Sequence, residues 1–267
     1  MKKNFKTLAC IVSALAALQA ISCQKKDGAV ASAQPVTIMV AAAASLENAY
    51  TKTLIPRFNA KYPNIIIEGT YDSSGKLQTQ IEQGLQADVF MSAAKKQMNT
   101  LVEKGFVSAQ SVIPLLENKL VLIKKKGTTS AAKDFATITQ AKSIAIGDPA
   151  SVPAGQYAEE AFSVIGNWKE IFAKASLGTN VTEVLGWVAA GSAEVGVVYA
   201  TDAASQPDVE VITFLPEGIL SAPVIYPVAV LAKSGHPKEA AIFVEYLASP
   251  EGLSIFKEYG FSENKGK

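Results

Sequence analysis

VTIMVAAAASLENAY, residues 36–50, is an apolar run followed directly by the polar start of a helical pattern. Residues 36–40 predict a buried strand, and Ser45 stands where the following helix is expected to begin. A helix start presents free backbone N–H groups, and the aligned peptide dipoles favour negative charge there. The stretch therefore leaves two roles open for Ser45, an anion ligand or an ordinary N-cap.

Apolar runs recur along the chain and alternate with helical patterns. They fall at residues 36–40, 65–68, 89–91, 120–124, 143–146, 195–199, 209–213 and 224–231. Strands separated by helices indicate an α/β fold with mainly parallel sheets. Helix ends are indicated by Ser74 with Gly84, by Pro153 with Gly166 and by Asn180 with Gly191. Pro56 predicts a kink or two short helices in the first helical segment.

The length of the folded part favours two lobes. Residues 36–117 with 228–267 are expected to form lobe 1, and residues 118–227 lobe 2. No linker rich in proline or glycine separates them. Two crossings made by extended strands are therefore expected, near residues 117–120 and near residues 225–228.

The first 22 residues contain three lysines, no acidic residue and a short apolar segment, which is the pattern of an export signal. The segment ends at Cys23, in a context that resembles the lipobox of bacterial lipoproteins. Lipidation of Cys23 and ordinary cleavage after residues 31–33 are the two alternatives. Residues 23–35 are small and polar, which predicts a flexible tether. We expect an exported protein, periplasmic or at the cell surface, anchored to a membrane through Cys23.

The composition argues against most catalytic and nucleic-acid functions. Residues 1–22 hold three of the 25 basic residues and none of the 24 acidic ones, so the remainder carries a net charge of −2. A chain with this net charge has no excess of basic residues to attract the phosphates of a nucleic acid. Beyond Cys23 there is no thiol, and the single histidine, His236, lies in a predicted turn. We therefore expect no catalytic residue, no metal site and no cofactor.

Four predicted strand-to-helix junctions resemble one another, at Ser45, Ser74, Ala154 and Val181. In an open α/β sheet such junctions gather at the carboxyl ends of the strands, where ligands bind. Each offers N–H donors or a hydroxyl and none offers a formal charge. The single arginine, Arg57, is expected on a solvated helix face, which argues against an arginine clamp on the anion. These junctions predict an anion site made of neutral donors.

An ordered set of motifs resembles the periplasmic molybdate-binding proteins of molybdate ABC transporters. The motifs are Ala42-Ala43-Ala44-Ser45-Leu46, Ser73-Ser74, residues 80–90, residues 147–155, Gly196-Val197-Val198-Tyr199 with residues 200–203, and Tyr226-Pro227-Val228-Ala229. The likeness extends over about residues 36–261. It implies a type II periplasmic-binding-protein fold whose two lobes close on a tetrahedral oxyanion.

The resemblance also implies the ligands of that oxyanion. They would be the hydroxyls and backbone N–H groups of Ser45 and Ser74, the backbone N–H groups of Ala154 and Val181, and the Tyr199 hydroxyl. The bound ligand would be molybdate or tungstate, and the expected partner is an ABC permease that receives it from a monomeric binding protein.

Other functions stay open. Sulfate, phosphate or a small organic anion could be the ligand, and an enzyme on the same scaffold is a further alternative. Asp72 and Asp148 flank the proposed ligand loops. A carboxylate facing the anion would favour protonated phosphate, whereas turn and capping roles would leave only donors.

Overall fold

β1 (Val36–Ala43) is buried on both of its faces over residues 40–43. The computed structural model describes residues 34–266. Ile38 and Val40 pack in one apolar cluster with Phe58, whereas Ala41 packs in a second cluster with Leu77. A strand covered on both faces is expected to be a continuous apolar run, and this explains the sequence of residues 36–43.

The first sheet has six strands in the order β11-β4-β10-β3-β1-β2. Their bounds are Ser262–Glu263 for β11, Ile113–Asn118 for β4, Val224–Val230 for β10, Val89–Met91 for β3, Val36–Ala43 for β1 and Ile65–Asp72 for β2. β1 pairs in parallel with β2 and β3, while β10 is antiparallel to β3 and β4.

The second sheet has five strands in the order β7-β6-β8-β5-β9. Their bounds are Ala175–Gly178 for β7, Ile144–Gly147 for β6, Val195–Tyr199 for β8, Leu120–Lys125 for β5 and Val209–Phe214 for β9. β6 is parallel to β7 and β8, and β5 is antiparallel to β8 and β9. The predicted α/β class is thus confirmed. The sheets are mixed and not mainly parallel as predicted, because β4, β5, β9, β10 and β11 pair antiparallel, while the parallel pairs come from the strand–helix–strand segments.

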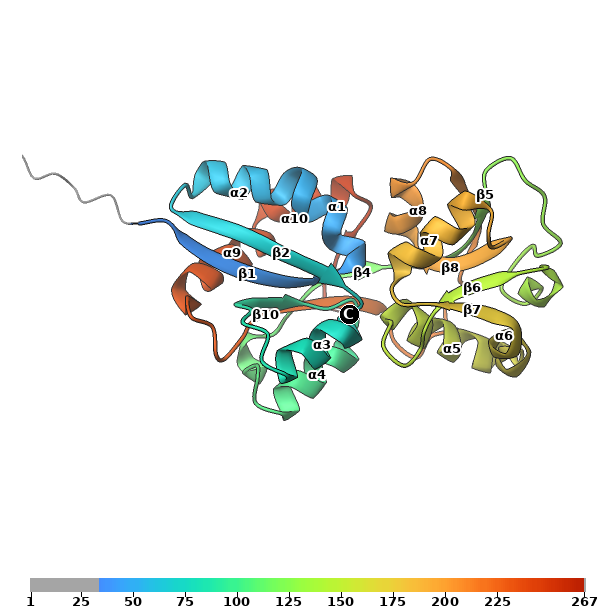
Figure 1. The fold of residues 1–267 in the computed structure, drawn as a ribbon, viewed down its shortest axis with the longest axis horizontal. Coiled ribbons are helices and arrows are strands. Elements are labelled where there is room, and N and C mark those ends of the chain that lie inside the picture. Colours follow the sequence, from blue (N-terminus) through green and yellow to red (C-terminus); the bar gives the residue numbers. More distant parts are fainter. Residues whose placement is uncertain (1–33, 267) are drawn as a thin grey trace, which may run out of the picture. The chain divides into compact units, whose positions relative to one another are not determined.

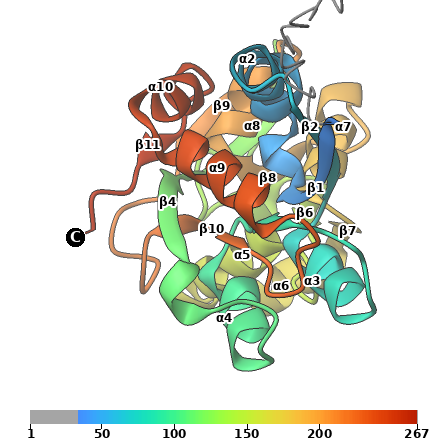
Figure 2. The same ribbon diagram turned by 90° about the vertical axis from the view of Figure 1, so that its left-hand side faces the viewer.

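Helices cover both faces of the sheets (Figure 1). Their bounds are Glu47–Ala49 for α1, Ile55–Lys61 for α2, Ser74–Glu82 for α3, Lys95–Glu103 for α4, Pro153–Ile165 for α5, Trp168–Lys174 for α6, Val181–Ala190 for α7, Ala200–Ser205 for α8, Pro237–Ala248 for α9 and Pro250–Glu258 for α10. In the first sheet α3 and α4 lie on the opposite face from α2 and α9 (Figure 2). Among the described residues no helix is both long and apolar enough to span a membrane.

The chain crosses between the sheets twice. The first crossing is at Lys119, between β4 and β5, where the sequence predicts it. The second occupies residues 215–223, between β9 and β10, and not residues 225–228. The prediction was wrong because β10 pairs along its whole length in the first sheet. The expected boundary between residues 227 and 228 consequently falls inside a strand.

The first helical segment continues through Pro56 without a break. A π-helical turn at Tyr50–Leu54 precedes α2, and Pro56 is the second residue of α2. Proline lacks an N–H donor and disrupts the hydrogen-bond pattern of the turn before it, and a local π-helical turn is one way to accommodate that. The segment is therefore not divided into two short helices as predicted, and the change before Pro56 is one of helix type.

Gly155 lets α5 approach the end of β6 closely. A Cβ atom at Gly155 would lie 2.0 Å from the Gly147 carbonyl oxygen, whereas one at Gly186, in α7, would meet nothing within 4 Å. We expect Gly155→Ala to lower the free energy of unfolding by about 1–3 kcal/mol through overpacking. Gly186→Ala should raise it by about 0.5–1 kcal/mol through helix propensity. Urea unfolding of both variants measures this, and equal effects would contradict the close approach.

Candidate anion-binding site

Ser45 lies in a 3-10 turn, Ala44–Leu46, directly after β1. Its Oγ is 2.9 Å from the hydroxyl oxygen of Tyr226, and it forms no side-chain cap. The N-cap role considered for Ser45 is therefore wrong, because the turn has no side-chain cap at all. The hydroxyl is instead held by a residue 181 positions away.

Ser74 is the first residue of α3, and Ser73 is its N-cap residue. Ser74 Oγ accepts a hydrogen bond from the Ala93 N–H at 2.9 Å, which leaves its own O–H free to donate. Ser73 Oγ is buried and has no hydrogen-bond partner in the described part of the chain. Ser73 was not predicted as a site residue, although its adjacency to Ser74 is a signal that could have indicated it.

Ala154 and Val181 lie at the amino ends of α5 and α7. Ala154 follows Pro153, which has no N–H, so the Ala154 amide is the first free donor of α5. Val181 is the first residue of α7, whose N-cap Asn180 accepts a hydrogen bond from the Glu183 N–H at 2.9 Å. The cap therefore leaves the Val181 amide available.

Tyr199 ends β8, and 1% of its surface is exposed. Its hydroxyl has no hydrogen-bond partner among the residues that the structure describes. Burial is the main cause that raises the pKa of Tyr199 well above its ordinary value. The side chain is therefore neutral and carries an unused O–H donor.

These groups surround a small cavity between the two sheets. Its lining residues are Ala43, Ala44, Ser45, Asp72, Ser73, Ser74, Ala93, Val152, Pro153, Val181 and Tyr199. Four of the five predicted ligands line the cavity, while Ala154 is the chain neighbour of the lining residue Pro153. The volume is about 10 Å³, room for the centre of about one water-sized sphere. A space of this size has no room for an extended organic anion in the arrangement described.

The two sheets' loops are in contact around the cavity. The Gly75 N–H donates to the Ser151 carbonyl at 2.9 Å, and Asn180 Nδ2 donates to Asp72 Oδ1 at 3.3 Å. A Cβ atom at Gly75 would lie 2.4 Å from the Ser151 carbonyl oxygen. The described chain is thus in a closed arrangement that depends on the absence of a side chain at Gly75.

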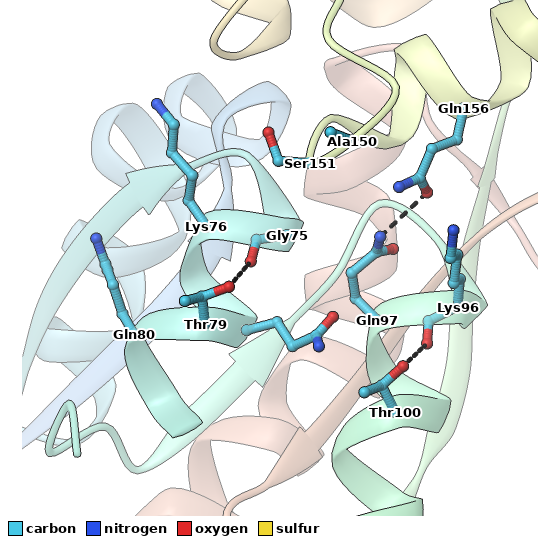
Figure 3. Close-up of a pocket in the computed structure, with 11 residues that line it drawn as sticks. Gly75, Lys76, Thr79, Gln80, Lys96, Gln97, Thr100, Ala150, Ser151 and Gln156 are labelled. Atoms are coloured by element: carbon cyan, nitrogen blue, oxygen red, sulfur yellow. Dashed lines mark hydrogen bonds between the residues drawn. The ribbon is translucent and has the colours of Figure 1, made fainter. Parts of the chain in front are cut away.

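A larger groove of about 460 Å³ lies beside this contact (Figure 3). Gln97 Nε2 donates to Gln156 Oε1 at 3.0 Å across it, and Lys76 and Lys96 contribute to its lining. Gln97 is buried, but Thr79, Gln80 and Lys96 are exposed, and none of the five predicted ligands lines this groove.

Asp72 and Asp148, the two acidic residues that flank the proposed ligand loops, both accept hydrogen bonds from the protein itself. Asp72 lines the cavity, but its Oδ1 accepts the Ser73 N–H at 2.7 Å and is paired with Lys76 at 3.3 Å. Asp148 Oδ1 accepts the Ala150 N–H at 2.9 Å, as in an Asx turn, and does not line the cavity. Asp72 thus lines the cavity with its Oδ1 engaged by other donors, whereas Asp148 has a turn role outside the lining.

Asp202, on α8, is a buried acid that sequence reasoning missed. Its carboxylate accepts the Tyr199 N–H at 3.1 Å, and it has no ion-pair partner within the described residues. Burial raises the pKa of Asp202 to about 7. Within residues 34–266 no group of three or more histidine, cysteine or acidic residues is placed to hold a metal ion.

Comparison with known proteins gives a family match over most of the chain. A family model described as bacterial extracellular solute-binding protein matches residues 38–262. A Bacillus subtilis (strain 168) protein, provisionally named ABC transporter substrate-binding lipoprotein YvgL, is 34% identical over 259 residues, covering 97% of this chain and 99% of that protein. The molybdate-binding protein ModA of Escherichia coli (strain K12) is 36% identical over 234 residues, covering 84% of this chain and 88% of ModA.

A solved structure agrees with these relatives. It is described as the substrate binding domain of a provisionally assigned molybdenum ABC transporter from Clostridium difficile. The TM-score is 0.66 at 35% sequence identity, and the likeness covers 86% of this chain and 100% of that chain. The two-lobed fold is therefore shared over almost the whole described part.

The raised pKa of Asp202 predicts a pH-dependent stability. Below the ordinary pKa of 3.8 the carboxyl is protonated in both the folded and the unfolded chain. Between 3.8 and about 7 the unfolded chain releases this proton first, so stability is lost as pH rises through this window. We expect Asp202→Asn to raise the free energy of unfolding by about 2–4 kcal/mol at pH 8 and to change it little below pH 4.

Urea unfolding of the wild type and the variant between pH 4 and 8 measures this difference. Asp134 supplies a control of opposite sign, because hydrogen bonds from Thr137 lower its pKa. Asp134→Asn should therefore reduce stability at neutral pH, and the reduction should fade as pH falls. A stability gain from Asp202→Asn that is the same at all pH values would contradict the buried-acid interpretation.

Proposed function

Because the chain belongs to the family of bacterial extracellular solute-binding proteins, we propose that it captures molybdate, and also tungstate, and delivers the anion to an ABC permease. The observation that carries the proposal is the cavity lined by Ser45, Ser74 and Tyr199, whose hydroxyls are buried and neutral. The names of the E. coli relative and of the C. difficile structure support the same ligand. We propose that the protein has no enzymatic activity and acts as a monomer.

Neutral donors favour a fully deprotonated dianion. Molybdate offers four acceptor oxygens and no proton, so hydroxyl and amide donors satisfy it completely. Monohydrogen phosphate also needs an acceptor, and an unmatched buried polar group costs about 1–3 kcal/mol. Asp72 is the one carboxylate in the cavity lining, and it is the reason to test phosphate as the alternative ligand.

The donors come from both sheets, which gives the anion a way to favour closure. Ser45 and Ser74 follow strands of the first sheet, whereas Ala154, Val181 and Tyr199 belong to segments of the second. An anion that contacts both sets only in the closed arrangement shifts the population toward it. We propose that the permease receives this closed form.

Titration calorimetry with molybdate, tungstate, sulfate and phosphate tests the proposed ligand. We expect molybdate and tungstate to bind most tightly. Ser45→Ala and Tyr199→Phe should each weaken molybdate binding by about 1–3 kcal/mol, since each removes one buried donor and leaves an anion oxygen unmatched.

The matched control is Tyr259→Phe, which removes a hydroxyl bonded to Thr53 outside the cavity lining. Its affinity should equal that of the wild type. Preferential binding of phosphate or sulfate by the wild type would reject the molybdate assignment. Unchanged affinity in both cavity variants would reject the site.

We further propose that the protein is exported and lipid-anchored through Cys23. Cys23 lies outside the described residues, and support comes from the export-signal pattern of residues 1–22 and from the lipoprotein name of the B. subtilis relative. Cells given a labelled fatty acid should yield labelled protein, and Cys23→Ser should abolish the label. Unlabelled wild-type protein released in soluble form would favour ordinary signal cleavage.

A further inference from the structure

Asn118 has a fixed amide orientation at the end of β4. Its Oδ1 accepts the Lys119 backbone N–H at 2.9 Å. A backbone N–H can only donate, so the acceptor must be the amide oxygen. The amide nitrogen, Nδ2, therefore faces the other two partners of Asn118, the Thr201 hydroxyl at 2.9 Å and the Tyr226 hydroxyl at 3.3 Å.

This orientation determines how the Tyr226 hydroxyl bonds. Asn118 Nδ2 can only donate, so the Tyr226 oxygen accepts from it. The other hydrogen-bond partner of the Tyr226 hydroxyl within residues 34–266 is Ser45 Oγ, at 2.9 Å. Tyr226 is fully buried, and an O–H without an acceptor there would be unfavourable. The Tyr226 O–H therefore donates to Ser45.

Ser45 is thereby left with its own O–H unused. Its oxygen accepts from Tyr226, and its hydroxyl forms no other hydrogen bond in the part of the chain that the structure describes. Ser45 lines the small cavity, and Tyr226 does not. We propose that Tyr226 and Asn118 are positioning residues, which orient the Ser45 hydroxyl as a donor toward the bound oxyanion. This inference rests on the proposed function of the cavity.

A double-mutant cycle with molybdate as the probe tests this inference. Tyr226→Phe removes the hydroxyl that orients Ser45 and should weaken molybdate binding about tenfold, the size of one net hydrogen bond. In a Ser45→Ala background the same substitution should change the affinity less than twofold, because Tyr226 then has no hydroxyl to orient. Tyr259→Phe, which also removes a hydroxyl from a hydrogen-bonded pair, should bind like the wild type in both backgrounds.

A merely structural role for Tyr226 would weaken binding equally in both backgrounds, and this result would overturn the proposal. Unchanged affinity of the Tyr226→Phe single variant would overturn it as well. Thermal unfolding of the unliganded proteins verifies that all variants are folded at the temperature of the titration.

A second variant applies if Tyr226→Phe does not fold. Asn118→Asp keeps an acceptor for the Lys119 N–H but removes the donor toward Tyr226, so Tyr226 donates to the new carboxylate and Ser45 must donate to Tyr226. The added charge weakens anion binding in every background. The loss with Ser45 present should exceed the loss in the Ser45→Ala background by about tenfold, and equal losses would overturn the proposal.

Failure of the proposed function gives a different result. In that case wild-type protein prefers sulfate or phosphate over molybdate in the calorimetric panel. The same cycle, performed with the preferred anion, still shows whether Tyr226 acts through Ser45.

Discussion

The site depends on gathering neutral hydrogen-bond donors around one small space, whose lining holds a single carboxylate, Asp72, paired with Lys76. Strand ends and helix starts meet between the two sheets, so backbone amides at Ala154 and Val181 and hydroxyls at Ser74 and Tyr199 come together from distant parts of the chain. Such donors are strong in a medium of low dielectric constant because water does not compete for them. The fold must therefore bring the lobes into close contact, and the contact of Gly75 with Ser151, which leaves no room for a side chain, makes this possible.

A donor is useful only when its hydrogen points the right way, and a hydroxyl can rotate. Backbone amides at helix starts have fixed directions, whereas Ser45 needs a neighbour to direct it. The chain of hydrogen bonds from the Lys119 N–H through Asn118 and Tyr226 provides that direction. It begins at Lys119, where the chain passes from the first sheet to the second. Residues that order the site are thus located at the crossing about which the lobes are connected.

Sequence patterns predicted the elements that are buried and periodic. Each of the eight predicted apolar runs contributes to a strand, and α5 and α7 end at glycines with positive φ as expected. β7 and β11 were missed because they are short strands whose exposed residues give no continuous apolar run. β4 has six residues and was missed because it contains Pro114, a residue that argues against a strand. The junction residues of the candidate site were predictable because each is local to a strand end. Tyr226 and Asp202 were not, since their roles depend on partners in space. Tyr226 is 181 positions from Ser45, and nothing in the local sequence reveals that contact.

The same low dielectric environment that strengthens the donors also keeps the buried tyrosine hydroxyls near the cavity neutral. Burial holds the pKa of Tyr199 and of Tyr226 well above the ordinary value, so both hydroxyls keep their protons. The Asp202 carboxylate accepts a hydrogen bond from the Tyr199 backbone N–H. Because its pKa is about 7, a large share of this carboxyl group is protonated near neutral pH. An ionised carboxylate there would repel a bound dianion, and desolvation opposes that ionisation. Desolvation therefore strengthens the donors and keeps Tyr199 and Tyr226 uncharged, and both effects favour the binding of an oxyanion.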